Sequence, residues 1–122
     1  MNHWKRIFSV VAIAAITLVS QGAWAHATLL SSMPAASAEL DKAPKEISLK
    51  FNEKLEEAFS FIKLTDNTQR EIVVAKAHLD AEDPTQLKLD LPPLPKGTYA
   101  VSWSAMTYDG HKRKGDFTFT VK

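Results

Sequence analysis

The chain has 122 residues, of which 45% are hydrophobic and 24% charged, and its formal net charge is +1. This length fits one soluble domain and is too short for two. Because the sequence has no basic cluster beyond residues 112–114 and no aromatic residues interleaved with basic ones, it excludes a nucleic-acid-binding protein. It contains no cysteine, which excludes disulfides and thiolate metal ligands.

The first 25 residues have the composition of an export signal peptide. Residues 5–6 are basic, and residues 7–20 are apolar apart from one threonine and two serines. This run of 14 residues is shorter than the roughly 20 that span a bilayer as a helix. It is followed by Ala-Trp-Ala at residues 23–25, a small-x-small cleavage signature. We predict cleavage after Ala25 and a mature domain of residues 26–122 that is not membrane-embedded; a retained N-terminal anchor is the alternative.

Cleavage would change the charge balance of the chain. It removes two of the 15 basic residues and none of the 14 acidic ones, so the mature domain has a net charge of −1. With no cysteine, hydrophobic burial alone must stabilise this domain.

Short β-prone runs separated by turn residues dominate the rest of the chain. Residues 47–51, Ile-Ser-Leu-Lys-Phe, and residues 117–121, Phe-Thr-Phe-Thr-Val, alternate apolar and polar side chains. This alternation is typical of strands with one buried face. Proline, glycine and aspartate turns separate the runs. In chain order, we expect strands at 27–31, 46–51, 59–65, 71–75, 86–91, 98–104 and 116–121.

Helical segments are few. Residues 35–40 and 54–58 each permit one helical turn, but neither sustains apolar spacing long enough for a core helix. The pattern therefore predicts an all-β domain, a seven-stranded antiparallel β-sandwich of Greek-key type with an immunoglobulin-like or cupredoxin-like fold.

After cleavage, His26 would be the first residue. It then offers two nitrogen donors, the free α-amino group and an imidazole nitrogen, which can chelate one metal ion in a ring. The ordinary pKa values of these groups, about 8 and about 6.5, let a metal displace the remaining protons at neutral pH. A histidine at this position can also be accidental, because the leader peptidase reads mainly the residues before the cut.

A carboxylate and an imidazole stand two residues apart in the segment Tyr108-Asp109-Gly110-His111. On an extended segment this spacing directs both side chains to one side, with backbones about 7 Å apart. Gly110 lets the chain tighten so that the two side chains converge on one ion. The alternative interpretation is an ordinary Asp-Gly hairpin turn with a surface histidine.

Glu53 follows the strand that we expect to end at Phe51, where a side chain leaves the sheet and can face a pocket. Its alternative interpretation is a solvated charge among neighbouring charged residues. An amine, two imidazoles and one or two carboxylates form a nitrogen and oxygen donor set without sulfur. Such a set suits tetragonal Cu(II) or Ni(II) better than Cu(I), whereas zinc prefers tetrahedral geometry.

Four segments follow one another in order across the predicted mature chain: His26-Ala-Thr-Leu-Leu-Ser-Ser-Met-Pro-Ala, Leu49-Lys-Phe-Asn-Glu53, Trp103-Ser-Ala-Met-Thr-Tyr-Asp-Gly-His111 and Gly115-Asp-Phe-Thr-Phe. Together they resemble the CopC/PcoC family of periplasmic copper-resistance proteins. The resemblance implies a seven-stranded Greek-key β-sandwich with one Cu(II) at one end. It also implies that His26, through its amine and its ring, holds this copper together with Asp109 and His111, and that Glu53 is a weak ligand or lies close by.

Many members of that family also carry a methionine-rich segment that binds Cu(I) at the opposite end of the sandwich. The corresponding residues 61–73 contain neither methionine nor histidine, so the thioether ligands that Cu(I) needs are absent there. Met33 and Met106 are isolated beside apolar positions, and we expect them to pack in the core or near the surface. We expect His78 to lie in a polar loop without a role, and Trp103 to lie in the core.

The resemblance implies a non-catalytic periplasmic protein that buffers or carries Cu(II) in copper homeostasis or resistance, acts as a monomer and has a CopD-type inner-membrane protein as partner. One alternative is a copper oxidase-type enzyme with a histidine brace, because polysaccharide monooxygenases also hold copper with an N-terminal histidine and a second histidine. Asp109 would guard the open positions that such an enzyme needs. The other alternative is a metal-free β-sandwich interaction module, in which His26 and His111 are incidental.

Overall fold

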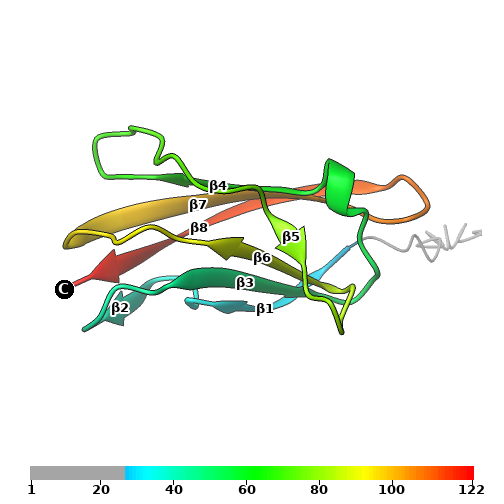
Figure 1. The fold of residues 1–122 in the computed structure, drawn as a ribbon, viewed down its shortest axis with the longest axis horizontal. Coiled ribbons are helices and arrows are strands. Elements are labelled where there is room, and N and C mark those ends of the chain that lie inside the picture. Colours follow the sequence, from blue (N-terminus) through cyan, green and yellow to red (C-terminus); the bar gives the residue numbers. More distant parts are fainter. Residues whose placement is uncertain (1–26) are drawn as a thin grey trace, which may run out of the picture.

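The computed structural model describes residues 27–122, which form two packed β-sheets (Figure 1). A 3₁₀ turn, η1 (Glu57–Phe59), precedes β4. Over the same residues, no helical segment has the length and apolar character needed to cross a membrane. The strands are β1 (Leu29–Met33), β2 (Ala38–Leu40), β3 (Glu46–Phe51), β4 (Phe61–Thr65), β5 (His78–Leu79), β6 (Gln86–Asp90), β7 (Gly97–Met106) and β8 (Lys112–Val121).

Each sheet has four strands. Sheet A has the order β1-β3-β6-β5, and sheet B has the order β2-β8-β7-β4. The pairs are antiparallel except that β2 runs parallel to β8. Within the described residues, only two connections join neighbouring strands of one sheet, β5 to β6 and β7 to β8. Every other connection between successive strands crosses from one sheet to the other. This arrangement confirms the predicted all-β sandwich.

The core lies between the inner faces of the two sheets. In β3, Ile47, Leu49 and Phe51 are at most 1% exposed, as the alternating pattern predicts. Ser48 points to the opposite face, where the side-chain amide of Gln86 donates a hydrogen bond to its hydroxyl at 2.9 Å. From sheet B, β7 contributes the buried residues Tyr99, Val101, Trp103 and Ala105.

The predicted strand at 71–75 is wrong. Only Glu71 forms a bridge, to Thr65, and the backbone N–H of Ile72 donates to the carbonyl of Leu64 before the chain leaves the sheet. Val73 is 91% exposed. β-branched residues favour strands only where a neighbouring strand and a buried face are available, and this segment has a partner only at its first residues.

Three further differences concern short or extended elements. Residues 35–40 do not form a helical turn, because Ser37 has a φ of +62° and Ala38–Leu40 pair with β8. His78 does not lie in a loop but begins the two-residue strand β5, opposite Lys88. The structure therefore has eight strands within residues 27–122 rather than seven, and β7 and β8 extend well beyond the predicted runs.

Gly115 lies directly beneath the indole of Trp103, its partner across β7 and β8. A Cβ atom built on Gly115 would stand 2.3 Å from the indole ring, while the same ring packs edge-on against Phe51 with ring centroids 5.1 Å apart. We expect Gly115→Ala to lower the free energy of unfolding by about 1–3 kcal/mol, the usual cost of overpacking. Thermal and urea unfolding measure this effect.

The matched control is Thr118→Ala, at an exposed position of the same strand. We expect this change to stay within about 0.5 kcal/mol of the wild type. If Gly115→Ala is as stable as the control, the packing of the Trp103 indole does not require a glycine at position 115.

Candidate metal site

The hairpin between β7 and β8 is a tight turn at residues 107–111, at the right-hand end in Figure 1. The backbone N–H of Gly110 donates to the carbonyl of Thr107 at 3.0 Å, and the N–H of Thr107 donates to the carbonyl of His111, also at 3.0 Å. Gly110 has a φ of +86°, a conformation that glycine adopts at little cost. The backbone is thus the Asp-Gly turn of the alternative interpretation, and this turn decides where the side chains of the loop point.

The turn brings the side chains of Asp109 and His111 together. Oδ2 of Asp109 lies 3.0 Å from Nδ1 of His111, and the two side chains are 48% and 35% exposed. The hydroxyl of Thr107 and, to a smaller extent, the His111 ring lower the pKa of Asp109 below its ordinary value. The carboxylate is therefore ionised at neutral pH, in the form that binds a cation. One carboxylate and one imidazole stand side by side at an accessible edge of the sandwich.

Thr107 holds this pair in place, and the sequence analysis missed it. Thr107 is 2% exposed, and its hydroxyl donates a hydrogen bond to Oδ1 of Asp109. Its backbone also forms an antiparallel bridge with Leu55, which ties the hairpin to the segment after β3. The alternating pattern of β7 could have indicated that Thr107 is buried. Val101, Trp103 and Ala105 point inward, and Thr107 is the next residue in that series. A hydroxyl at an inward position needs a hydrogen-bond partner.

Glu53 lies on the wall of the same surface hollow as Thr107, Tyr108 and Asp109. The residue before it, Asn52, accepts a hydrogen bond from the backbone N–H of Thr28 at 2.7 Å through Oδ1 and donates its own N–H to the Thr28 carbonyl at 3.2 Å. The beginning of the described chain is therefore fastened next to Glu53. In Figure 1 it lies at the same end of the molecule as the β7–β8 hairpin.

The predicted ligand His26 and the predicted signal peptide lie outside the described residues. Among residues 27–122, no three His, Asp or Glu side chains come close enough to hold a metal ion together. The structure thus brings Asp109 and His111 into contact and places Glu53 on the same hollow as Asp109.

Of the other described residues that the sequence singled out, Tyr108 lies beside this pair. Trp103 is buried, as predicted. Met33 is 71% exposed on the edge strand β1, so a core position for it is wrong. Tyr108 is exposed and lines the hollow beside Asp109.

Thr107→Val tests how the pair is positioned. The change keeps the buried shape of the side chain but removes the hydroxyl that fixes Asp109. We expect it to weaken the Cu(II) binding that the sequence predicts for this pair about 10–100-fold, as is usual for residues that orient metal ligands. Competition titration measures the affinity, and electron paramagnetic resonance reports any change in coordination geometry.

Thr107→Ser is the matched control, because serine retains the hydroxyl and is expected to restore both the affinity and the spectrum. A Val variant with wild-type affinity and spectrum would show that the hydroxyl does not position the pair.

Comparison with known proteins gives one consistent result. The CopC domain family model matches residues 29–122. Protein YobA of Escherichia coli K12 is 41% identical over 113 residues, which cover 92% of this chain and 91% of YobA. The crystal structure of CopC from Methylosinus trichosporium OB3b matches with a TM-score of 0.75 and 34% identity, over 80% of this chain and 94% of that protein. The crystal structure of PcoC, a methionine-rich copper resistance protein from E. coli, matches with a TM-score of 0.69 and 41% identity, over 80% of this chain and all (100%) of PcoC.

Proposed function

The chain belongs to the CopC family, whose members are copper resistance proteins and not enzymes, and from this membership we propose that it binds one Cu(II) ion in the periplasm. His26, Asp109 and His111 are the proposed ligands, and Glu53 is a weaker ligand or a neighbour of the ion. The observation that carries the proposal is the contact of 3.0 Å between the Asp109 carboxylate and the His111 ring. The protein buffers or carries copper in copper homeostasis or resistance.

The first ligand depends on removal of residues 1–25, which gives His26 a free amine. Ala27 is buried, and Thr28 is bonded to Asn52, next to Glu53. The described chain therefore begins beside the hollow that Glu53 lines, and His26 directly precedes it in the sequence. This order along the chain supports His26 as a further donor.

The oxidation state follows from the donor set. An amine, two imidazoles and a carboxylate favour tetragonal Cu(II), whereas Cu(I) favours thioethers and thiolates. The chain has three methionines and no cysteine, and Met33 stands exposed on β1. We therefore propose one Cu(II) site and no separate Cu(I) site. We further propose that the protein acts as a monomer and hands the ion to a CopD-type inner-membrane protein.

Titration of the protein beginning at His26 with Cu(II) tests this function. We expect one equivalent to bind, with a tetragonal, nitrogen-rich electron paramagnetic resonance signal and quenching of tryptophan fluorescence. Cu(I) and Zn(II) should bind more weakly. Absence of tight Cu(II) binding would favour a metal-free interaction module, and copper-dependent oxidation of a sugar polymer with peroxide would favour an enzyme of the histidine-brace type.

A further inference from the structure

The outer face of sheet B has a hollow lined by basic, polar and aromatic side chains. The hollow is shallow and lies over β4, β7 and β8. In β4 and β7, the residues that point to this face alternate with buried residues such as Ile62 and Val101, so the packing of the core determines which side chains the face carries. None of the described residues that line it is acidic: they are Phe61, Lys63, Ser102, Trp103, Ser104, Lys112 and Lys114.

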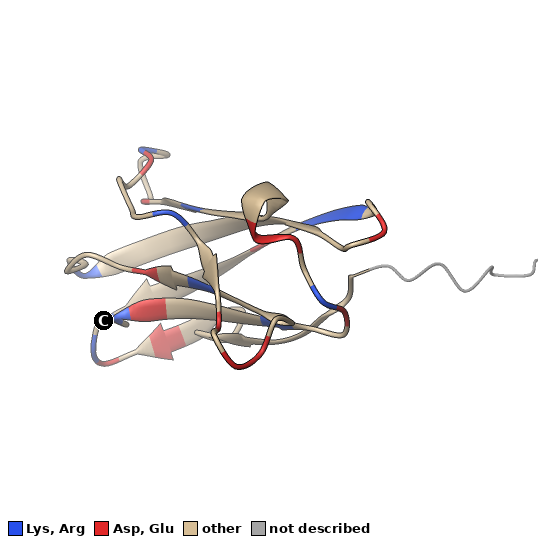
Figure 2. Cartoon of the chain, turned by 45° about the vertical axis from the view of Figure 1, so that its right-hand side comes forward, with Lys and Arg blue, Asp and Glu red and all other residues tan. Residues whose placement is uncertain are grey.

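The three lysines of this hollow form no ion pair with any residue in the described range 27–122. Lys112 and Lys114 point to the same side of β8, with backbones about 7 Å apart. Lys63, two strands away, shares its cross-strand row with Ser102 and Asp116, so it lies about 10 Å across the sheet and about 7 Å along it from Lys114. The screening length at physiological salt is about 8 Å, so the potentials of Lys112 and Lys114 reinforce each other and Lys63 adds a weaker contribution. In Figure 2 the basic start of β8 stands out in blue beside the hairpin.

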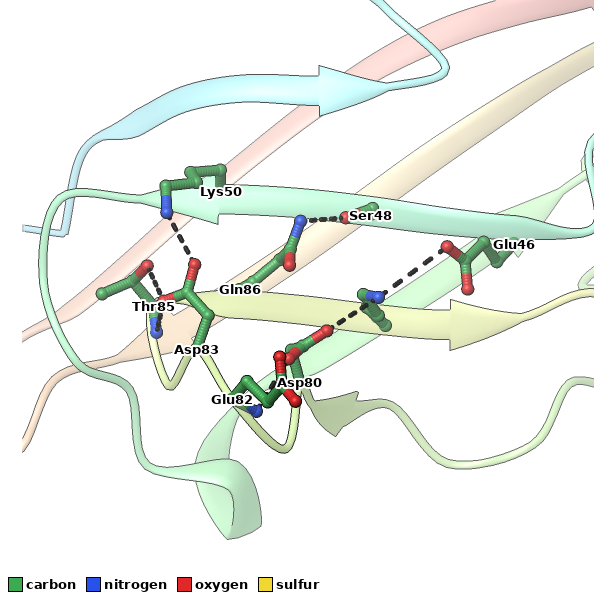
Figure 3. Close-up of polar contacts among 9 residues, drawn as sticks. Glu46, Ser48, Lys50, Asp80, Glu82, Asp83, Thr85 and Gln86 are labelled. Carbon is green, nitrogen blue, oxygen red and sulfur yellow. Dashed lines mark hydrogen bonds and ion pairs between the residues drawn. The ribbon is translucent and has the colours of Figure 1, made fainter.

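The outer face of sheet A shows that lysines of this protein pair with acids where acids are available. Lys50 contacts Asp83 at 2.6 Å, and Lys88 contacts Asp80 at 2.9 Å (Figure 3). Hydrogen bonds, first from Lys50 and then from Thr85, lower the pKa of Asp83 to about 2. The lysines of sheet B therefore differ from those of sheet A in lacking acidic partners within the described part of the chain.

Two further features of the hollow are suited to binding a peptide segment. Phe61 is 46% exposed although it lies on a strand, and it shares a cross-strand row with Ser104 and Lys114. The hydroxyl oxygen of Ser104 is buried and has no hydrogen-bond partner among the described residues. Buried polar groups without a partner are rare in native structures. The hollow thus offers positive charge and an apolar contact, above a buried hydroxyl that has no partner among the described residues.

We propose that this outer face of sheet B is a docking surface for an extended acidic segment of another protein. Carboxylates at alternate positions of an extended chain repeat about every 7 Å, which matches the spacing of Lys112 and Lys114. A segment lying over β7 would turn its acids toward Lys112 and Lys114 and the apolar side chains between them toward Phe61 on β4, because alternate side chains of an extended chain point to opposite sides. Because Lys112 directly follows His111, the docked segment would lie next to the hairpin. The proposal does not depend on a bound metal.

A lipid membrane fits this surface less well than an acidic protein segment. The basic area is narrow, and Asp116, which points to the same face of β8 as Lys112 and Lys114, ends the run of positive charge. Three lysines in a hollow give weak attraction to anionic lipids, which bind broad basic clusters of four to eight residues. A single extended segment can follow the line of Lys112 and Lys114 and avoid Asp116.

Titration of the metal-free, isotope-labelled protein with an extended peptide in which Asp alternates with Val tests this proposal by NMR. We expect amide shifts confined to β4, β7 and the first half of β8, which weaken several-fold as salt is raised. A peptide with Lys in place of Asp should cause none. The combined change Lys63→Gln, Lys112→Gln and Lys114→Gln should abolish the shifts, and Arg at the same three positions should retain them.

The control removes the same charge elsewhere, with Gln in place of the exposed Lys42, Lys45 and Lys96, and should bind the acidic peptide like the wild type. Equal loss in this control, or shifts spread over the whole surface, would reduce the effect to net charge and overturn the proposal. Binding to phosphatidylglycerol vesicles without binding to the peptide would assign the face to a membrane instead.

Discussion

His111→Ala is expected to weaken Cu(II) binding by more than about a hundredfold. Loss of residues that only orient a ligand already costs about 10–100-fold, and this change removes an imidazole donor itself. It also removes the partner of Oδ2 of Asp109, which lies 3.0 Å from the His111 ring. Competition titration against a chelator of known affinity measures the loss, and electron paramagnetic resonance should show one fewer nitrogen in the coordination sphere of any copper that still binds.

Two control variants separate this site from nonspecific effects. His78→Ala removes the other histidine of the described chain, on β5 in sheet A, and Met33→Leu removes an exposed thioether on β1. Both are expected to bind Cu(II) like the wild type. Wild-type affinity in His111→Ala, with loss in His78→Ala, would move the site to sheet A.

The strands could be predicted where apolar and polar residues alternate in the sequence and the apolar ones are buried in the structure. Residues 47–51 alternate in sequence, and in the structure Ile47, Leu49 and Phe51 line the core. Residues 71–75 contain more β-branched side chains than residues 47–51 but do not alternate, and the chain leaves β4 after one bridge. The two-residue strand β5 and the three-residue strand β2 are too short to leave a periodic pattern. Local sequence therefore identifies long half-buried strands and misses elements that depend on a distant partner.

The candidate site was predictable in its short-range part. The Asp-Gly-His spacing indicated that Asp109 and His111 could meet, and the structure brings their side chains into contact. Thr107 was missed because its importance lies in burial, which depends on how β7 packs against the rest of the sandwich. The position of Glu53 on the hollow beside Asp109 depends on the long-range bridge between Leu55 and Thr107, and no local pattern encodes that pairing.

Addition of one residue before His26 is expected to remove tight Cu(II) binding while leaving the fold intact. The extra peptide bond converts the α-amine, with an ordinary pKa of about 8, into an amide whose proton is far harder to displace, and it breaks the chelate ring of amine and imidazole. Asp109, His111 and the His26 ring would remain, but these three donors without the chelate ring hold copper less tightly than the four donors with it. The d–d absorption should lose its nitrogen-rich position, and the thermal unfolding of the metal-free proteins should coincide.

The two forms differ by a single residue at the start of the chain, so their comparison tests whether the free amine must stand on His26 itself. If the extended form binds one equivalent as tightly as the form beginning at His26, a free amine on His26 is not required, and the remaining donor must be sought in Glu53, the hairpin or the new N-terminus. If neither form binds, the Asp109–His111 pair serves the turn alone. A difference of several orders of magnitude would make removal of residues 1–25 a condition for copper binding, so that the precursor could not take up the ion before export.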